Sequence, residues 1–454
     1  MTANSHSEEY TQSVELHMAT KPSKSARPTV IDAELEDRIS WLPGHIIDQI
    51  LSHLPIRHAV TTSALSKIWR YKWTTIPNLV FDRKCVSAPS RPSDIVASEL
   101  LTIIDQVFSL HSGPINKFAL FFRDVMSDTN FDRWILYLTR KSIKELELVV
   151  WNEQPYKLPC YLFSCQSLHL LELYHCWINP PSAFRGFRNL KILKLAGVTI
   201  TQDAFENLIS GCPLLEDLKL AFFDGFTQAI IHAPNLKIFY LNGGKLESVI
   251  FENTFQLTKV TIVLDMYMNI ESNQSRSDEC SSKLLNFFSH LPHLQSLEIY
   301  SCFIKYLADG VVPVKLPKSC INLSYLSLCI DFNNLKEISA VLCLLRSSPN
   351  LQEIELYEMM EEEGSALLAQ VSYCWEDIFI GPTIPLGARR VSIVDISGTK
   401  SELDLIKFLL LYSPLLEQMY VSPSIHVKPE LGTELNRFKR ASRQVEVIYD
   451  GETK

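Results

Sequence analysis

The sequence predicts an α/β protein in which a short N-terminal helical segment is followed by a solenoid of parallel strands. Two observations favour this class. Apolar residues between positions 37 and 82 recur at helical spacing. From residue 143 onward, a motif of three apolar positions returns every 21 to 25 residues over its first six copies. The 454 residues, 46% of them hydrophobic and 21% charged, suffice for more than one globular domain.

The N-terminal part begins with a polar leader and continues into helices. Residues 1–34 are rich in Ser, Thr, Glu and Lys, so we expect them to be disordered. One helix face is then indicated by apolar residues at i, i+4 and i+8 spacing: Ile46, Ile47, Ile50, Leu51 and Leu54. Pro43 suits the first helical position and Pro55 ends the helix. Further apolar runs around Val60 and Trp69 lead us to expect three short helices before Pro77.

This helical segment is too apolar for its size. A chain of about fifty residues buries only a modest share of its surface, so exposed Leu, Ile and Trp favour a partner surface. The alternative is a helical cap on the domain that follows. From Asp37 to Lys84, seven basic residues outnumber three acidic ones, a local charge of +4 in a chain of net charge -8. Such a patch favours an acidic partner, with a solvated helix face as the alternative.

The stretch LPGHIIDQILSHLP, followed by AVTTSALSKIWRYKW, resembles the F-box, the adaptor-binding motif of ubiquitin-ligase receptors, in the form typical of plant families. We assign residues 35–84 to it. The resemblance implies docking on a Skp-type adaptor, and thence a cullin, through one apolar set: Leu42, Pro43, Ile46, Ile50, Leu51, Leu54, Val60, Leu65 and Trp69. Gly44 and His45 stand where acidic residues are usual, which removes favourable negative charge from a helix N-terminus. The apolar ridge is intact, so we expect docking to persist.

Residues 85–142 are expected to form a linker and a first strand and helix that cap the repeats. The linker is the Pro- and Ser-rich stretch SAPSRPS at residues 87–93. Residues 95–110 have helical periodicity, residues 117–124 are apolar as in a strand, and residues 131–140 again indicate a helix.

Residues 143–343 are expected to form leucine-rich repeats. Eleven segments were compared with the template L-x-x-L-x-L, from Ile143 to the last at Leu416, and most fit it. The match near Val391 and Ile393 is poor. A period of 21 to 25 residues is typical of leucine-rich repeats. Side chains two apart in a strand point the same way, so the second and third apolar positions enter a shared core and the repeats must stack.

Residues 344–449 resemble the FBD region that follows the repeats in plant F-box proteins. The resemblance rests on LLRSSPNLQEIEL at 344–356, Cys374-Trp375, and ELDLIKFLLLYSPLLEQMYV at 402–421. It implies that the solenoid continues, with its parallel strands on the concave face. At residues 381–398 the chain departs from the family, because Ala388 and Arg389 stand where a Leu-containing strand start is usual. The polar stretches 268–283 and 358–364 are expected to be loops.

Catalytic and metal-binding motifs are absent from the sequence. It contains no P-loop, no G-x-G-x-x-G after a strand and no G-x-S-x-G elbow. His45, His53 and His58 are not at the i, i+4 spacing of a helical metal pair, and Cys176 and Cys302 occupy a structural repeat position. We therefore expect no enzyme activity, no cofactor and no metal.

The bulk composition bears on the partners and on the compartment. The eleven cysteines, an odd number, and the expected absence of a signal peptide favour a reducing compartment, the nucleus and/or the cytoplasm. No apolar run reaches the length of a membrane span. The acidic net charge argues against a nucleic-acid partner.

Tyrosine is over-represented at the outward positions of the repeat strands, which are template positions three, five and seven. At the chain's frequency of 16 in 454 about one tyrosine is expected there. Six are found: Tyr174, Tyr240, Tyr300, Tyr325, Tyr357 and Tyr420. Tyrosine combines large contact area with a polar tip, which suits protein recognition. The excess predicts a face that binds a protein target, with the ordinary preference of tyrosine for strands as the alternative.

These expectations combine into a substrate receptor of a Skp-cullin-F-box (SCF-type) ubiquitin ligase. The F-box would bind the adaptor and the repeats would hold an unknown target protein. One alternative is an interaction scaffold that binds the adaptor without delivering a target for ubiquitylation. Another, a small-molecule sensor on the concave face, has precedent in plant F-box receptors but no supporting motif in this sequence.

Overall fold

A computed structural model describes residues 39, 41–86, 92–123, 128–151, 154–264, 282–301, 303–359, 385–424 and 431–451. The chain divides into two compact units, Met1–Cys212 and Pro213–Lys454. Each is described by itself, and the boundary falls within the repeats. The expected leader at residues 1–34 lies outside the described residues. So do Cys302, Cys374 and Trp375.

The first unit begins with the helical head, residues 39–76. Its elements are α2 (Gly44–Ser52), α3 (Ile56–Thr61) and two 3-10 turns, Thr62–Ala64 and Lys72–Thr75. The third helix predicted around Trp69 is therefore a set of turns. Pro43 stands one place before the helix, as its N-cap, and the first turn contains no acidic residue.

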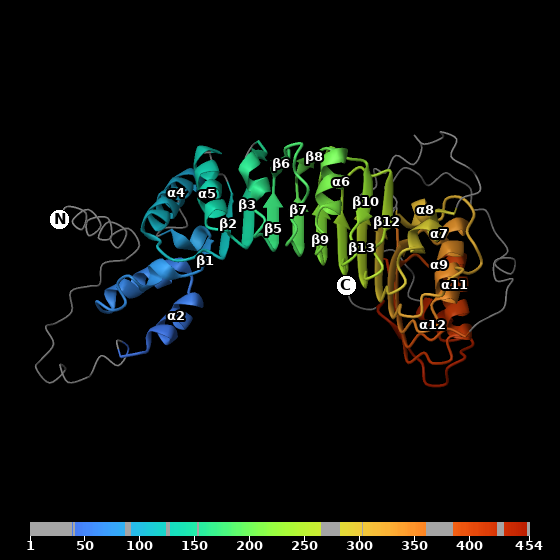
Figure 1. Ribbon diagram of the computed structural model, residues 1–454. Coiled ribbons are helices and arrows are strands. Elements are labelled where there is room, and N and C mark those ends of the chain that lie inside the picture. The colour runs from blue at the N-terminus through green and yellow to red at the C-terminus, as the bar shows by residue number, and fades with distance from the viewer. Residues whose placement is uncertain are drawn as a thin grey trace, which may run out of the picture. The chain divides into compact units, whose positions relative to one another are not determined.

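Strand β1 (Asn78–Phe81) follows the head inside the stretch assigned to the F-box, and the sequence reading missed it. It pairs in parallel with β2. The sheet of the first unit has the order β1-β2-β3-β5-β7, with β2 (Lys117–Arg123), β3 (Glu145–Trp151), β5 (Leu170–Tyr174) and β7 (Ile192–Ala196). The unit also contains α4 (Ser93–Leu110), α5 (Asp128–Arg140) and α6 (Gln202–Ser210), and the 3-10 turns Arg83–Cys85 and Cys160–Ser164. A small sheet is formed by β4 (Tyr156–Lys157), β6 (Cys176–Ile178) and β8 (Thr199–Ile200). Figure 1 shows these elements.

The second unit contains a longer parallel sheet in strict chain order, β9-β11-β13-β14-β15-β16-β17-β18-β19. The strands are β9 (Asp217–Ala221), β11 (Ile238–Asn242), β13 (Lys259–Leu264), β14 (Ser296–Ser301), β15 (Tyr325–Ile330), β16 (Glu353–Glu358), β17 (Arg390–Ile396), β18 (Gln418–Pro423) and β19 (Glu446–Tyr449). A second sheet pairs β10 (Gln228–His232) with β12 (Ser248–Glu252). The helices are α7 (Lys283–Phe288), α8 (Phe303–Leu307), α9 (Leu335–Ser347), α11 (Lys400–Tyr412) and α12 (Leu431–Leu435).

The predicted leucine-rich-repeat architecture is confirmed. All eleven template segments form strands, the first being β3 and the last β18. The template side chains make the core; Leu236, Phe239 and Leu241 are fully buried. The burial pattern of β5, β7 and β9 alternates with period two, as expected for strands with one face in a core.

The poorest segment still forms a strand, β17, although its register with β18 shifts between Ile393 and Ile396. Ala388 occupies the place of the first template leucine and is fully buried. A Cβ at the preceding Gly387 would lie 2.8 Å from the carbonyl oxygen of Pro349, so the backbone of the neighbouring repeat fills the space. Close packing against Pro349 therefore accounts for Gly387, while Ala388 fills the buried position with a smaller side chain than the template leucine. The sheet continues through it with the register Val391 to Met419.

A left-handed backbone conformation at the end of several strands was not predicted. The residue after template position seven has positive φ in several repeats: His175 (54°), Gly197 (60°), Phe222 (49°) and Gly243 (68°). In this conformation the N–H of His175 donates to the Ala196 carbonyl at 2.8 Å, and that of Phe222 donates to the Asn242 carbonyl at 2.9 Å. In both places the bond continues the parallel pairing of the two strands by one residue.

Most of the predicted loop at 268–283 lies outside the described residues, and so does most of the one at 358–364. At the end of the first, Ser282 is the N-cap of α7, and its hydroxyl accepts the Leu285 N–H at 3.3 Å. The polar composition of this end therefore serves to begin a helix. The loop prediction is wrong for Lys283, the first residue of α7, and for Glu358, the last residue of β16.

Candidate functional site: an apolar head and a polar strand face

The structure separates the nine residues predicted to contact an adaptor into three groups. Leu51, Val60 and Trp69 are buried inside the head, at 0%, 1% and 2% exposure. Pro43, Ile50 and Leu65 are exposed, and three more are partly exposed: Leu42, Ile46 and Leu54. The structure therefore brings six of the nine to the surface and keeps three in the core.

The buried members support the surface. The Trp69 indole N–H donates to the Ile39 carbonyl at 3.3 Å, and the Ser63 hydroxyl donates to the Arg70 carbonyl at 2.8 Å. Arg57 bonds the carbonyls of Lys84 and Val86 at 3.1 and 3.0 Å. After α3 the chain forms turns instead of a regular helix, and these contacts take the place of helical hydrogen bonds. They hold the turns that present the exposed side chains.

The head exposes more large apolar side chains than the sequence reading named. Trp41 is 81% exposed, Leu65 55% and Ile68 52%, and the set is completed by Ile39, Ile50 and Tyr71. We refer to these six as the apolar set of the head. Four of the six were not predicted as contacts, because the predicted set was taken from the positions that match the F-box motif and these four are not among them: Ile39, Trp41, Ile68 and Tyr71. Their signal is the density of aromatic and branched residues between positions 39 and 73.

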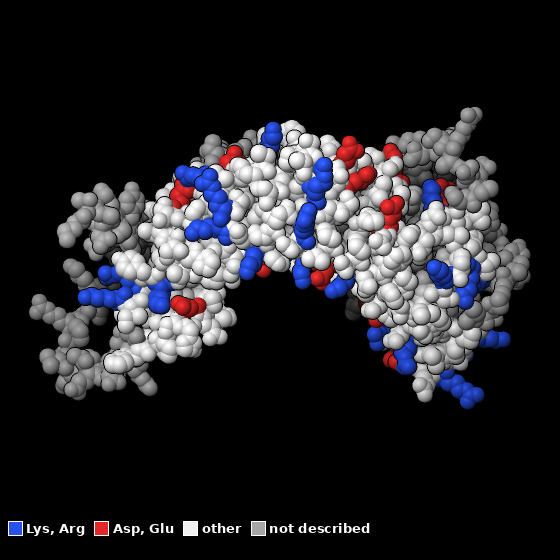
Figure 2. Space-filling view, in the orientation of Figure 1, with Lys and Arg blue, Asp and Glu red and all other residues white. Residues whose placement is uncertain are grey.

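Basic side chains accompany this apolar set. The described head and the following turn contain Arg57, Lys67, Arg70, Lys72, Arg83 and Lys84 against Asp48 and Asp82. Figure 2 shows Lys and Arg over the helices of the head. Lys72 and Asp48 lie 3.7 Å apart with both side chains well exposed, which makes this pair a weak one. The head therefore combines an apolar surface with positive charge.

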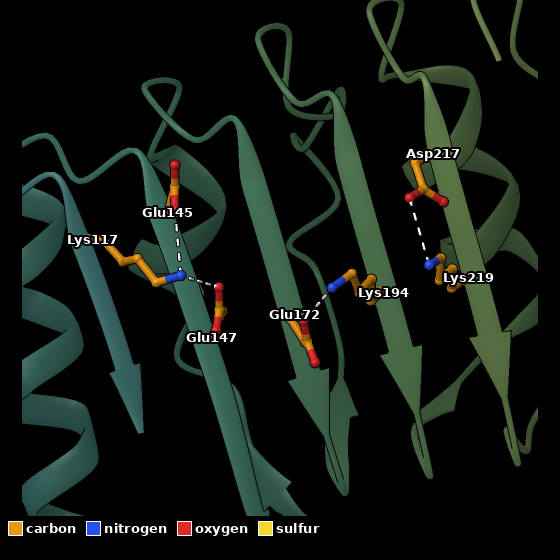
Figure 3. Close-up of polar contacts among 7 residues, drawn as sticks. All are labelled: Lys117, Glu145, Glu147, Glu172, Lys194, Asp217 and Lys219. Carbon is orange, nitrogen blue, oxygen red and sulfur yellow. Dashed lines mark hydrogen bonds and ion pairs between the residues drawn. The ribbon is translucent and has the colours of Figure 1, made fainter. Parts of the chain in front are cut away.

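In the first unit, the strand face opposite the leucine core is lined with ion pairs. Lys117 on β2 bonds Glu147 on β3 at 2.7 Å and lies 3.7 Å from Glu145, while Lys194 on β7 bonds Glu172 on β5 at 2.8 Å. Figure 3 shows these side chains on the near side of the strands, with helices behind. Burial lowers the pKa of Lys117, but the two glutamates raise it further, so the net shift is upward.

In the second unit, the same face has charge pairs and a tyrosine cluster. Lys219 lies 3.8 Å from Asp217 on β9, as Figure 3 also shows. Three of the six predicted tyrosines come together on β14, β15 and β16: Tyr300, Tyr325 and Tyr357. The ring centroids of Tyr300 and Tyr357 are 5.9 Å apart.

The other three predicted tyrosines lie apart from this cluster. Tyr174 packs on Trp151 with ring centroids 4.2 Å apart, Tyr240 stands on β11, and the Tyr420 hydroxyl donates to Asp450 at 2.6 Å. The six tyrosines therefore do not form one site. All six were predicted to point away from the leucine core, but only three of them lie close together.

Most of the described cysteine thiols are unsuited to nucleophilic chemistry. Burial raises the pKa of Cys85 to about 11 and that of Cys176 to about 12. The Cys176 thiol also donates to the Tyr174 carbonyl at 3.3 Å, which fits its structural position in the repeat. A buried thiol that stays protonated at neutral pH is a poor nucleophile.

Among the described residues, no three His, Cys, Asp or Glu side chains are arranged to hold a metal ion. Within the same ranges, the helices are too short or too polar to cross a membrane.

The fold and its surfaces define a class: a repeat protein with an apolar helical head, built for protein interaction. The F-box domain model matches residues 39–81, and a model described as FBD-associated F-box protein At5g56370, LRR repeats, matches residues 131–356. The chain is 38% identical over 426 residues to F-box/FBD/LRR-repeat protein At1g13570 of Arabidopsis thaliana, covering 92% of this chain and 99% of that protein. The chain belongs to the plant F-box/FBD/leucine-rich-repeat family.

A more distant relative agrees with this assignment. FBD-associated F-box protein At4g10400 of Arabidopsis thaliana is 26% identical over 437 residues, which cover 91% of this chain and all of that protein. A solved complex of Rad7 and Elc1 in yeast covers 98% of this chain and 94% of the matched one, with 12% identity and a TM-score of 0.28, too low to bear on function. F-box/LRR proteins are typically non-enzymatic interaction modules, and neither matching model is a catalytic family.

Proposed function

We propose that this chain is the substrate-recognition subunit of a Skp-cullin-F-box ubiquitin ligase. Its F-box binds a Skp-type adaptor, and its repeats hold a target protein near a ubiquitin-charged conjugating enzyme. Tethering raises the effective concentration of target lysines, so the chain itself supplies no chemical group. In this proposal the domains are the F-box at 35–84, the cap at 85–142, the repeats at 143–343 and the FBD region at 344–449.

The observation that supports adaptor binding is the apolar set of the head. Six large apolar side chains are exposed within 33 residues of the sequence, and this favours a partner surface over the head. The direct contacts are proposed to come from Pro43, Ile50 and Leu65, flanked by the three partly exposed members of the predicted set. Leu51, Val60 and Trp69 then act from the core by holding this surface in shape.

Adaptor capture tests the proposal. Ile50→Ala combined with Leu65→Ala should lower affinity for a purified Skp-type adaptor at least tenfold, because central apolar contacts are worth about 1 to 2 kcal/mol each. The measurement is calorimetric titration of the full chain. Ile321→Ala, 56% exposed in the second unit, is the matched control and should bind normally.

Equal affinity of the double variant and the wild type would contradict the adaptor contact. Target delivery is a separate question, since an interaction scaffold would also bind the adaptor. Proteins captured by the repeats should accumulate when the proteasome is inhibited if the chain delivers them. Captured proteins whose turnover is unchanged would favour the scaffold.

The proposed target surface is the outward strand face that includes the predicted tyrosines. Tyr300, Tyr325 and Tyr357 are the strongest candidates, because they lie together and are partly exposed. Tyr174, Tyr240 and Tyr420 remain candidates for contacts elsewhere along the strands.

A further inference from the structure

Glu355 is at the centre of the tyrosine cluster. It shares one outward row with Ser327 on β15 and Glu298 on β14 through the strand register. Tyr325 stands one row before it. Tyr300 and Tyr357 stand one row after it, so aromatic rings lie on both sides of the row. Neighbouring strands are about 4.8 Å apart, which places all six side chains within the reach of one ligand side chain or short peptide segment.

The cluster is held in shape by its own hydrogen bonds. Tyr325 donates its hydroxyl to Oε2 of Glu355 at 2.7 Å, and Tyr357 donates to the same oxygen at 3.1 Å. The Tyr300 and Ser327 hydroxyls share a bond of 3.0 Å, and Ser327 is fully buried although its row points outward. The side chains are therefore positioned before any ligand arrives.

The charges of this face leave one carboxylate without a cation. Lys259 pairs with Glu298 at 2.7 Å, and Arg390 donates two bonds to Glu353, each of 3.0 Å. In the part of the chain that the structure describes, no ion pair includes Glu355, and its Oε1 accepts no hydrogen bond. Glu355 is thus a negative charge fixed by phenols on one oxygen and open on the other.

The phenols remain hydrogen-bond donors at neutral pH. Burial, with the neighbouring Glu355 carboxylate, raises the pKa of Tyr357 to about 12 and raises that of Tyr325 well above its usual value. Deprotonation of either phenol would place two negative charges side by side. The cluster therefore has the single charge of Glu355, framed by neutral rings.

We propose that Glu355, with the rings of Tyr300 and Tyr357, binds an arginine side chain of the target protein. A guanidinium is planar, donates to a carboxylate and stacks on an aromatic face, so it matches both parts of the cluster. The pair of Arg390 and Glu353 on the adjoining strands is an internal example of the same recognition. This inference rests on the proposed function, since it names the feature of the target that the repeats select.

Selection from a phage-displayed library of random peptides on the immobilised full chain tests the inference. Peptides selected on the wild type should be enriched in arginine, and selection on Glu355→Gln should lose that enrichment. Glu252→Gln, a half-exposed carboxylate on β12 of the second sheet, removes the same charge elsewhere and should preserve it. Absence of arginine enrichment, or equal enrichment on Glu355→Gln, would overturn the inference.

The affinity of one selected peptide separates charge from stacking. Glu355→Gln should weaken binding about tenfold or more, as expected for loss of a charged hydrogen-bond partner. Replacing the peptide arginine by lysine should weaken it severalfold. Tyr357→Phe keeps the ring and should bind nearly as the wild type, whereas Tyr357→Ala should bind clearly less. Equal affinities of the Phe and Ala variants would overturn the role of the ring. Unchanged thermal unfolding of each variant excludes a folding defect.

The adaptor assay keeps this inference distinct from the proposed function. Glu355→Gln should capture the adaptor as the wild type does. If the wild type binds adaptor but selects no arginine, only the inference fails. If the wild type binds no adaptor, the proposed function fails whatever the peptides contain.

Discussion

The helical head and the repeats of the second unit use apolar residues in opposite ways. In the repeats, the template side chains are almost completely buried; Leu218, Phe239 and Ile299 have 0% exposure. In the head, the apolar set is exposed although the sequence is equally hydrophobic. A repeat is covered by the next repeat, whereas the described part of the chain does not cover the apolar set of the head. Apolar density therefore indicates core in a solenoid and interface in a short helical head.

The largest expected effect separates core from surface inside the head itself. Trp69→Ala should lower the free energy of unfolding of the head by about 3 to 5 kcal/mol, because the indole is buried and its N–H holds Ile39. Leu65→Ala should cost about 0.5 kcal/mol or less, because the side chain is exposed. Urea denaturation followed by tryptophan fluorescence measures both.

Leu65→Ala should at the same time weaken adaptor binding, so it is the cleaner test of docking. Similar destabilisation by the two substitutions would break the division between core and interface. It would mean that Leu65 is covered by the chain in solution.

The sequence predicted the repeats better than the head, for a physical reason. A leucine template repeated eleven times averages out local exceptions, and stacking leaves one geometry for most copies. The head has a single copy of each signal, and the resemblance to the F-box placed Leu51, Val60 and Trp69 among the adaptor contacts although they are buried. Periodicity finds the apolar side of a helix but does not say whether the chain or a partner covers it.

The sequence predicted that the tyrosines of the candidate target site point outward, but not which contacts they make. Alternation along a strand showed that the six tyrosines point outward. The template alignment already places Leu297, Leu326 and Ile354 side by side, as the register does, but it does not show that Tyr325 and Tyr357 both donate to Oε2 of Glu355. The positive φ at His175 and Phe222 was missed because glycine, the residue that signals such a conformation, stands at this position only in some repeats.

The second prediction concerns Glu337, an ionisable residue that the repeats bury as completely as their leucines. Glu337 at the start of α9 is 1% exposed, and burial raises its pKa to about 7 from 4.5. Its carboxylate accepts the Asp331 N–H at 2.9 Å and the Asn334 amide at 2.8 Å. The folded state therefore prefers the protonated form, and stability should fall as pH rises from about 4.5 through about 7.

Above pH 7 the ionised carboxylate should cost about 3 kcal/mol relative to pH 4. Glu337→Gln should flatten this dependence and be more stable than the wild type at pH 8. Urea denaturation at pH 5 and pH 8 measures the difference, with the exposed Glu446→Gln as the control for loss of one charge. A wild type whose stability rises with pH over this range would show that Glu337 is ionised at little cost.

The smallest expected effect tests whether an exposed apolar residue in the repeats resembles those of the head. Phe222 is 57% exposed and has a φ of 49°, at the position where Gly197 and Gly243 stand in other repeats. Phe222→Gly relieves this backbone strain but frees the unfolded chain, so we expect a net gain in stability of about 0.5 to 1 kcal/mol. Thermal unfolding measures the gain, and Phe222→Ala, which keeps the strain, should show none. Adaptor affinity should not change, because a single exposed ring in a solenoid is no part of the apolar set of the head. A loss of stability in the glycine variant would mean that the Phe222 ring packs against the chain in solution, and exposure in this structure would then not distinguish the two regions.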